Sequence, residues 1–165
     1  MSFEQEMSFT NKIHSEIAMP KFYVPNDMPN VVSEVGTLAD LRDGVDYTVH
    51  HASGKITVQE RFRRSKYKSY RDITFRYDKP CDPRDTRREF FKIKADAFLY
   101  GMVNDDGDDF EWAYMFSVEP VVAAVKEGIL PTEYRRNRGP SDTGFIAIQV
   151  SDIDKLGATL IKYNL

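Results

Sequence analysis

The chain has 165 residues, of which 41% are hydrophobic, and its formal net charge is −3. These values predict one globular domain over residues 1–165 and exclude a polycation that binds nucleic acid by bulk attraction alone. No apolar run approaches the ~20 residues that cross a bilayer, and the first residues are acidic where a secretory signal is basic. With one cysteine, Cys81, which cannot form an internal disulfide, the chain is expected to be cytoplasmic, with no membrane partner.

The N-terminal quarter predicts one helix and little other regular structure. Apolar residues at helical spacing favour a helix from Phe3 to Met19, which Pro20 is expected to end. Two prolines make residues 21–30 an expected irregular segment. The sequence Thr37-Leu38-Ala39-Asp40 predicts either a single capped helical turn or a loop.

Residues 44–63, with the sequence GVDYTVHHASGKITVQERFR, predict a β-hairpin. Apolar and polar residues alternate on both sides of a Ser53-Gly54 turn, as they do in half-buried strands. Side chains two positions apart on a strand point to the same face. Gln59 and Arg61 are therefore expected to share one face of the second strand, a hairpin away from Asp46.

The remaining elements follow from the same alternation and from helix start and stop signals. The predicted elements are strands at Ile73–Tyr77, Phe91–Tyr100 and Glu111–Val118, a helix at Glu119–Gly128, a strand at Phe145–Val150 and a helix at Ser151–Tyr163. The segments DKPCDPRDTRRE and YRRNRGPSDTG are expected to be irregular loops, and NDDGDD a polar turn. This order predicts an α/β protein with a mixed, largely antiparallel sheet flanked by helices.

The hairpin resembles the core of the restriction-endonuclease-like superfamily, known by its PD-(D/E)XK motif. In that family an Asp on one strand is followed, after a hairpin, by an acid or Gln, any residue, and Lys. Asp46, Gln59 and Arg61 occupy the corresponding positions. The resemblance implies a restriction-endonuclease-like fold and a single nuclease-like domain.

The resemblance also implies an activity, a cofactor and partners. It implies a metal-dependent endonuclease that hydrolyses DNA phosphodiesters, with Asp46, Gln59 and Arg61 as catalytic residues. Asp46 and Gln59 would bind Mg²⁺ or Mn²⁺, and Arg61 would stabilise the scissile phosphate. A carboxylate of the first helix, Glu6 or Glu16, would complete the metal site, and the protein would act as a homodimer, as many family members do.

A basic stretch, RFRRSKYKSYRDITFR, begins at Arg61 and contains one acid, Asp72. Cations interleaved with tyrosines are typical of surfaces that follow phosphates and contact bases. The predicted nucleic-acid-binding residues are Arg63, Arg64, Lys66, Lys68 and Arg71, and Arg135, Arg136 and Arg138 could extend the set. The alternative is a solvated strand edge whose cations discourage aggregation.

Three other interpretations stay open. Arginine cannot lose its proton as lysine can, so Arg61 is compatible with a non-catalytic nucleic-acid-binding module on the same fold. The chain could instead be a protein-interaction or inhibitory protein, or Asp46 and Arg61 could form an ordinary cross-strand pair.

The sequence also predicts the surroundings of two further side chains. Asp96 lies in an apolar segment and needs a partner, either a core cation or the site around Asp46. His14, on the opening helix, is expected to be solvated.

Overall fold

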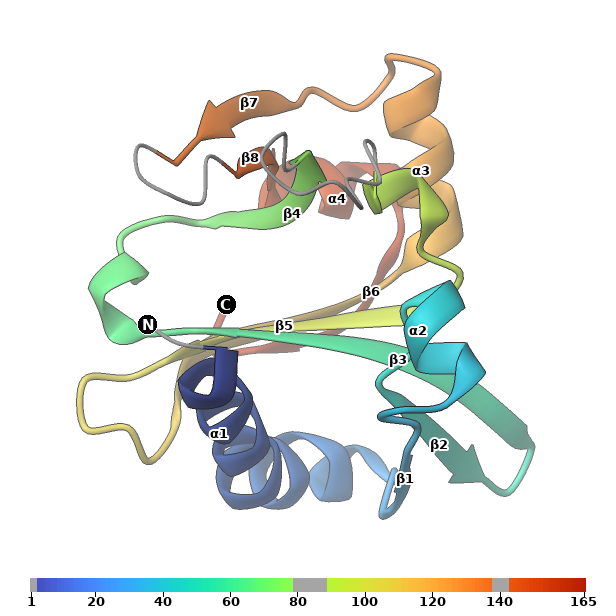
Figure 1. Ribbon diagram of the computed structural model, residues 1–165, viewed down its shortest axis with the longest axis vertical. Coiled ribbons are helices and arrows are strands. Elements are labelled where there is room, and N and C mark those ends of the chain that lie inside the picture. The colour runs from blue at the N-terminus through green and yellow to red at the C-terminus, as the bar shows by residue number, and fades with distance from the viewer. Residues whose placement is uncertain (1–2, 79–88, 138–142) are drawn as a thin grey trace.

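The computed structural model describes residues 3–78, 89–137 and 143–165 of the chain. In these ranges two β-sheets and the helices around them form three layers (Figure 1). The predicted mixed α/β architecture with a largely antiparallel sheet is confirmed, whereas a restriction-endonuclease-like arrangement of the strands stays a prediction.

The central layer is a six-stranded sheet in the order β1-β2-β3-β5-β6-β9. Strands β3 and β5 are parallel, and all other neighbours in this sheet are antiparallel. The predicted hairpin is confirmed as the pair β2 and β3. The strands span Asn30–Ser33 (β1), Tyr47–His51 (β2), Gly54–Arg63 (β3), Ala97–Val103 (β5), Phe110–Ser117 (β6) and Thr159–Tyr163 (β9).

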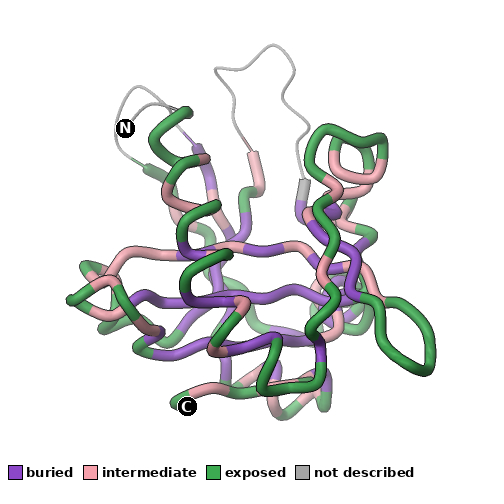
Figure 2. The backbone as a smooth tube through the Cα atoms, turned by 90° about the horizontal axis from the view of Figure 1, so that it is seen from below, coloured by how far each residue is buried: buried purple, intermediate pink, exposed green. Residues whose placement is uncertain are grey.

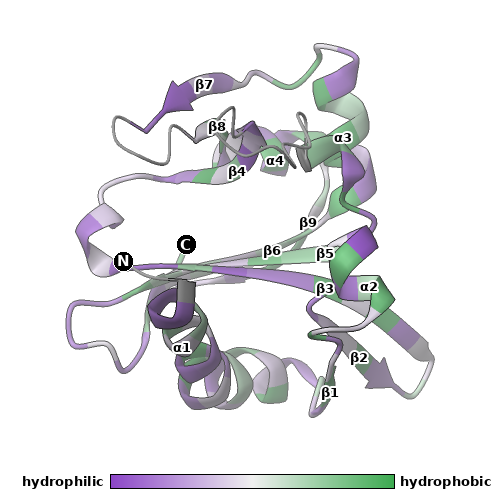
Figure 3. Cartoon of the chain, viewed as in Figure 1, coloured by the Kyte–Doolittle hydropathy of each residue, from purple (hydrophilic) through white to green (hydrophobic). Residues whose placement is uncertain are grey.

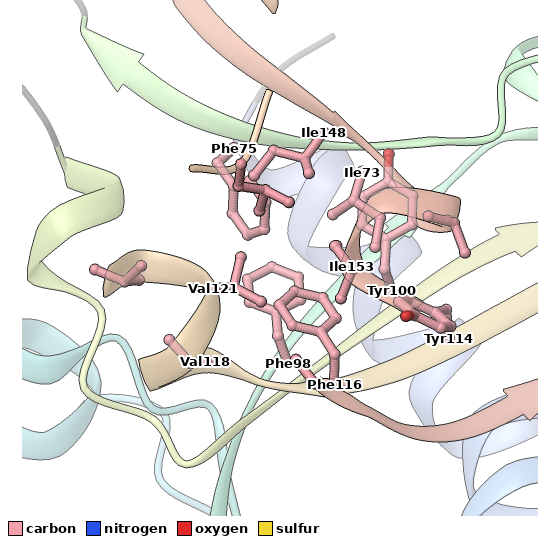
Figure 4. Packing of buried hydrophobic residues seen from close by; sticks show 14 of the residues in the cluster. Ile73, Phe75, Phe98, Tyr100, Tyr114, Phe116, Val118, Val121, Ile148 and Ile153 are labelled. Atoms are coloured by element: carbon pink, nitrogen blue, oxygen red, sulfur yellow. The ribbon is translucent and has the colours of Figure 1, made fainter. Parts of the chain in front are cut away.

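A second, three-stranded antiparallel sheet in the order β4-β8-β7 lies over one face of the large sheet. Its strands span Asp72–Asp78 (β4), Glu133–Arg136 (β7) and Gly144–Gln149 (β8). Helices α3 (Val118–Lys126) and α4 (Val150–Leu156) lie on the same side. The aromatic core between the two sheets includes Phe75, Phe98 and Phe116, whose rings meet edge to face or stacked (Figure 4).

The opposite face of the large sheet is covered by helix α1 (Phe3–Ile13) and a π-helix over His14–Tyr23 (Figure 1). The prediction that Pro20 ends the helix is wrong, because Pro20 lies inside the π-helix. The wider turn removes the usual i→i+4 ladder that a proline would interrupt. Burial of Ile17, Phe22 and Tyr23 against the sheet stabilises the continuation.

Several boundaries differ from those predicted because tertiary pairing overrides local pattern. Strand β1 lies partly in the segment expected to be irregular, and β7 lies in the expected basic loop. Residues 91–96 precede strand β5 instead of belonging to it, and the first two of them belong to a short 3-10 helix at Glu89–Lys92. The last predicted helix ends at Gly157, whose φ of 77° closes α4, and the chain then forms edge strand β9.

The alternative of a capped helix at Thr37 is confirmed. Its side chain accepts a hydrogen bond from the backbone N–H of Asp40 and caps α2 (Leu38–Asp43). Gly44 ends that helix in the left-handed region. A 3-10 turn at Val24–Asn26 and another at Ser65–Tyr67 complete the described elements. The loop predicted at Asp78–Glu89, with Cys81, lies almost entirely outside the described residues.

Burial and hydropathy follow the layers. The central strands are the most continuously buried part of the chain (Figure 2), and β5 is buried along its whole length. Strand β7 and the outer surface of α1 are hydrophilic (Figure 3). In the part of the chain that the structure describes, no helix has the length and apolar character needed to cross a membrane.

Candidate functional site: a basic cleft between the two sheets

A cleft of about 690 Å³ lies where β3 of the large sheet faces the small sheet. Its walls come from β3, the connection to β4, the small sheet and the first helix. Seven of its lining residues are cationic, namely Arg61, Arg63, Arg64, Lys66, Arg76, Arg135 and Arg136. Three are acidic, namely Glu6, Glu60 and Asp72. The cleft therefore concentrates positive charge in a chain whose net charge is negative.

Strand β3 supplies one wall through alternate residues. Gln59, Arg61 and Arg63 are half-buried and alternate with the buried Val58, Glu60 and Phe62, which confirms the prediction that Gln59 and Arg61 share a face. The guanidinium Nη1 of Arg63 donates a hydrogen bond to Thr74 Oγ1 at 3.2 Å. Because Thr74 belongs to β4, this contact joins the two sheets across the cleft.

Aromatic rings hold several of the cleft guanidinium groups. The Arg63 guanidinium carbon lies 4.3 Å from the centroid of the Tyr67 ring, and that of Arg135 lies 5.6 Å from the Tyr70 ring. Further contacts of this kind are Arg64 over Phe9 at 4.0 Å, Arg61 over Phe145 at 5.5 Å and Arg136 over Tyr134 at 5.9 Å. Cation–π contacts of this kind restrict the orientation of a guanidinium plane without neutralising its charge.

Two of the three acids in the lining are already engaged by other side chains. Asp72 is buried and forms an ion pair with Arg135, with 2.7 Å between Oδ2 and Nη1. Arg135 also donates to Glu133 at 2.6 Å, and the hydrogen bond to Glu133 is the main cause of the raised pKa of Arg135. Glu60 is engaged on the opposite face of the sheet.

The carboxylate of Glu60 is fully buried in a polar cluster beneath β3. It accepts the Tyr23 hydroxyl at 2.5 Å and lies 2.9 Å from Nδ1 of His14, whose ring stacks on Tyr47 with centroids 3.9 Å apart. Burial raises the pKa of Tyr23 well above its usual value. The expectation that His14 is solvated is wrong, because the π-helix turns its ring onto the sheet.

Glu60 is the middle residue of the Gln-x-Arg motif, and the motif predicts no role for its side chain. The available signal was its position between Val58 and Phe62, which alternate with it toward the buried face. A glutamate that points to the same strand face as two core residues is expected to have a buried carboxylate with a hydrogen-bonding partner.

The carboxylate of Asp46 binds the protein backbone. Its Oδ2 accepts the N–H of Glu60 at 2.7 Å, which ties the start of the hairpin to β3. Burial raises the pKa of Asp46 to about 7. Among the described residues that line the cleft, Gln59 and Arg61 are present and Asp46 is not.

The described residues do not fit a divalent-cation site well. They contain no group of three or more His, Cys, Asp or Glu side chains placed to hold a metal. Glu16 is exposed beside Lys12, and Glu6 lies at the cleft but without a second carboxylate from Asp46. A Mg²⁺ or Mn²⁺ site at Asp46 and Gln59 stays a prediction.

Among the described cleft residues, Gln59 has the one buried polar side-chain atom without a hydrogen-bond partner. Its Oε1 is buried and accepts no hydrogen bond there. The amide lies against Gly44, where an added Cβ would come 3.5 Å from Oε1. A buried acceptor left without a donor costs folding free energy, and because this oxygen is shielded from solvent, a ligand in the cleft does not reach it.

Of the five predicted nucleic-acid-binding residues, Arg63, Arg64 and Lys66 line the cleft. Lys68 and Arg71 lie elsewhere. Lys68 forms an ion pair with Asp105 in the β5–β6 turn, and the guanidinium of Arg71 lies 5.7 Å from the Trp112 ring centroid. Arg138 lies outside the described residues. Two strand residues in the basic stretch, Arg61 and Arg76, line the cleft instead.

Asp96 has neither of its two predicted partners. It is exposed, and its Oδ2 accepts both the backbone N–H and the hydroxyl of Thr57, at 2.7 and 2.8 Å. It therefore fastens the start of β5 to β3. The acidic segment 105–109 forms the predicted polar turn, organised by Asn104 Oδ1, which accepts the N–H groups of Gly107 and Asp108.

Comparison of the chain with protein-family models, curated protein sequences and solved structures found no match. The resemblance to the restriction-endonuclease-like superfamily therefore rests on the hairpin residues alone, and the implied homodimer stays a prediction.

Proposed function

We propose that this protein binds nucleic acid through the cleft between its two sheets. The observation that carries the proposal is the set of seven cations lining one concave surface of a net acidic protein. Phosphate contacts by arginine and lysine supply most of the affinity of proteins for nucleic acid.

The electrostatics of the cleft support binding of a polyanion. Of its three acids, Asp72 is paired with Arg135 and Glu60 is hydrogen-bonded on the other face of β3. The third lining acid, Glu6, is exposed, and two acids outside the lining, Glu133 and Asp78, pair with Arg135 and Arg136. Walls of low dielectric on both sides strengthen the field of the cations inside a cleft.

The arrangement supports binding more directly than it supports cleavage. Arg61 faces the cleft and can stabilise phosphate charge, but an arginine does not act as a base. Asp46, the predicted metal ligand, holds the backbone of Glu60. Metal-dependent hydrolysis of DNA is thus a separate hypothesis that needs its own test.

Binding is tested by fluorescence anisotropy with labelled oligonucleotides over a series of salt concentrations. The variant Arg76→Gln/Arg136→Gln removes two exposed cleft cations. We expect about tenfold or more weaker binding, and a log Kd against log salt slope lowered by about 1.4 to 1.8, because each lost phosphate contact lowers it by about 0.7 to 0.9. The control Lys55→Gln/Lys155→Gln removes the same charge from exposed residues elsewhere. Equal losses in the two variants would contradict the proposal.

Cleavage is tested separately by incubating plasmid with the protein and Mg²⁺ or Mn²⁺. Nicking that disappears in Asp46→Ala, with the variant still folded by circular dichroism, would support the metal-dependent endonuclease. Nicking that survives Asp46→Ala would remove Asp46 from the site. Tight binding without nicking is the result that the cleft geometry favours.

A further inference from the structure

We infer that strand β1 and helix α2 form a surface that binds a second copy of this chain, strand to strand across a two-fold axis. The inference goes beyond the proposed function, because no residue of β1 or α2 lines the cleft. Three features carry it: an unpaired strand edge, exposed apolar side chains beside that edge, and a strand without charge.

The unpaired edge belongs to β1, an outer strand of the large sheet. On its far side no strand of the described chain pairs with it. Glu34, directly after β1, donates its backbone N–H to the Asp46 carbonyl, just before β2, at 2.8 Å. Because backbone groups alternate in direction along an antiparallel strand, the N–H and C=O groups of Val31 and Ser33 point outward. An edge of this kind is a template for pairing with another strand.

Exposed apolar side chains gather in and directly after β1. Leu38 and Leu41, one turn apart on α2, are 74% and 77% exposed, more than any other large hydrophobic side chain of the described chain. Val32 and Val35 are exposed as well, and no residue of α2 is buried. Apolar side chains concentrated on one exposed segment indicate an interaction surface.

Hydrogen bonds hold α2 close to the end of β1. The N–H of Thr37 donates to the Glu34 carbonyl at 2.9 Å, which folds the connection into a turn. The N–H of Val45 donates to the Ala39 carbonyl at 3.2 Å, which ties α2 to the start of the β2–β3 hairpin. Helix α2, which shows hydrophobic segments in Figure 3, therefore lies at the same end of the molecule as β1 (Figure 1).

The charge distribution favours a second copy as the partner. The four residues of β1 carry no charge, whereas each of the other outer strands of the described sheets, β4, β7 and β9, contains at least one charged residue. A two-fold axis brings the same residues of two copies together, so self-pairing of a charged strand places like charges near each other. On β1 this repulsion is absent, and a charged peptide would find no opposite charge there.

The two acids between β1 and the middle of α2 have partners within the chain. Glu34 accepts the hydroxyl of Thr48 at 2.8 Å, and Asp40 accepts the N–H of Gly36 at 2.8 Å. These contacts hold both carboxylates in the folded connection, so the apolar side chains remain as the groups available to a partner.

Antiparallel pairing of two β1 strands uses all the outward backbone groups. With Val31 of one copy opposite Ser33 of the second copy, each outward N–H meets a C=O, and the two Val32 side chains lie opposite each other at the axis. Opposed β-branched side chains stabilise such a strand pair. Because α2 follows the C-terminal end of β1, the exposed leucines of the two copies flank the joined strands at opposite ends.

Sedimentation velocity of the full chain measures dimer formation. The protein concentration runs from about 1 μM to 1 mM, the range in which interfaces of small area associate. We expect the sedimentation coefficient to rise with concentration from the value of a monomer to that of a dimer.

Leu41→Lys tests the apolar part of the surface. We expect the dissociation constant of the dimer to rise about tenfold or more, because the two-fold axis places the substitution in the interface twice. The control Ile129→Lys makes the same change at a side chain that is 64% exposed after α3. It should leave the dissociation constant unchanged.

Ser33→Pro tests the strand edge. Proline lacks the N–H and is tolerated on an edge strand where that group faces solvent, so the monomer should unfold at the same denaturant concentration as the parent. The dissociation constant of the dimer should rise severalfold. In the parent, hydrogen exchange of the Val31 and Ser33 amides should slow as protein concentration rises, whereas exchange of Ala52, in the exposed β2–β3 turn, should not.

Two results would overturn the inference. One is a chain that stays monomeric over the whole concentration range, which would leave this surface to a different partner. The other is a dimer that Leu41→Lys and Ser33→Pro leave unchanged, because such a dimer uses another surface. Neither result bears on nucleic-acid binding by the cleft, which anisotropy measures separately.

Discussion

The two faces of strand β3 use the same alternation for opposite purposes. Toward the helices, Val58, Glu60 and Phe62 are buried, and the one charged group among them is hydrogen-bonded to Tyr23 and His14. Toward the small sheet, Gln59 and Arg61 line an accessible cleft. Five successive residues thus contribute both to the core and to the candidate site.

This comparison shows how a strand can carry a binding surface without losing stability. The charged group of the closed face is fully buried and hydrogen-bonded, whereas Gln59, Arg61 and Arg63 on the open face are only half-buried. Substitutions on the closed face should act on folding, and those on the open face on ligand binding.

The largest expected effect is that of Glu60→Ala. It leaves the Tyr23 hydroxyl and the His14 ring without their buried acceptor and opens a cavity, so the free energy of unfolding should fall by about 3–5 kcal/mol. The neighbouring Arg61→Ala, at a half-buried position on the cleft side, should cost about 1 kcal/mol or less. Urea denaturation measures both, and similar losses would remove the distinction between the faces.

Asp46 should make stability depend on pH. Its folded pKa of about 7 lies above its ordinary 3.8, so the protonated form favours the fold. Stability from this group is complete below pH 3.8 and is lost as pH rises through 7; between pH 5 and 8 the loss is about 2–3 kcal/mol.

The variant Asp46→Asn cannot ionise, and its amide oxygen can still accept the Glu60 N–H. Its stability relative to the parent should therefore rise over the same pH range. Denaturation curves at pH 5, 6.5 and 8 measure the difference. A difference that does not change with pH would show that Asp46 ionises normally in the folded protein.

Gly101→Ala tests how tightly the closed face is packed. A Cβ at this position would lie 2.5 Å from the Phe110 ring and 2.9 Å from the Phe62 ring, so one ring has to move. We expect a loss of about 1–3 kcal/mol in unfolding free energy with no change in nucleic-acid affinity. Thermal and urea denaturation measure the first quantity and anisotropy the second. Unchanged stability would indicate a loosely packed layer.

The smallest effect is expected for Lys68→Gln. This residue is exposed, pairs with Asp105 and is not among the described residues that line the cleft. The Kd for nucleic acid should change less than twofold, whereas the single variant Arg76→Gln, of equal charge change within the cleft, should weaken binding severalfold. Equal effects would place the binding surface along the basic sequence stretch, outside the cleft.

The sequence by itself determined the features that depend on local pattern. Alternation predicted the β2–β3 hairpin and the shared face of Gln59 and Arg61, and the Thr37 signal predicted one helix start. The uneven distribution of cations predicted a basic surface. Each of these depends on residues within one or two elements, so no distant contact is needed to infer it.

Only the tertiary structure decided which segments lie together. Strand β4 belongs to a second sheet, and that sheet brings Arg76, Arg135 and Arg136 opposite β3. The continuation of the first helix past Pro20 brings His14 and Tyr23 to Glu60. These outcomes depend on burial between elements far apart in the chain, and local propensity contributes little to them.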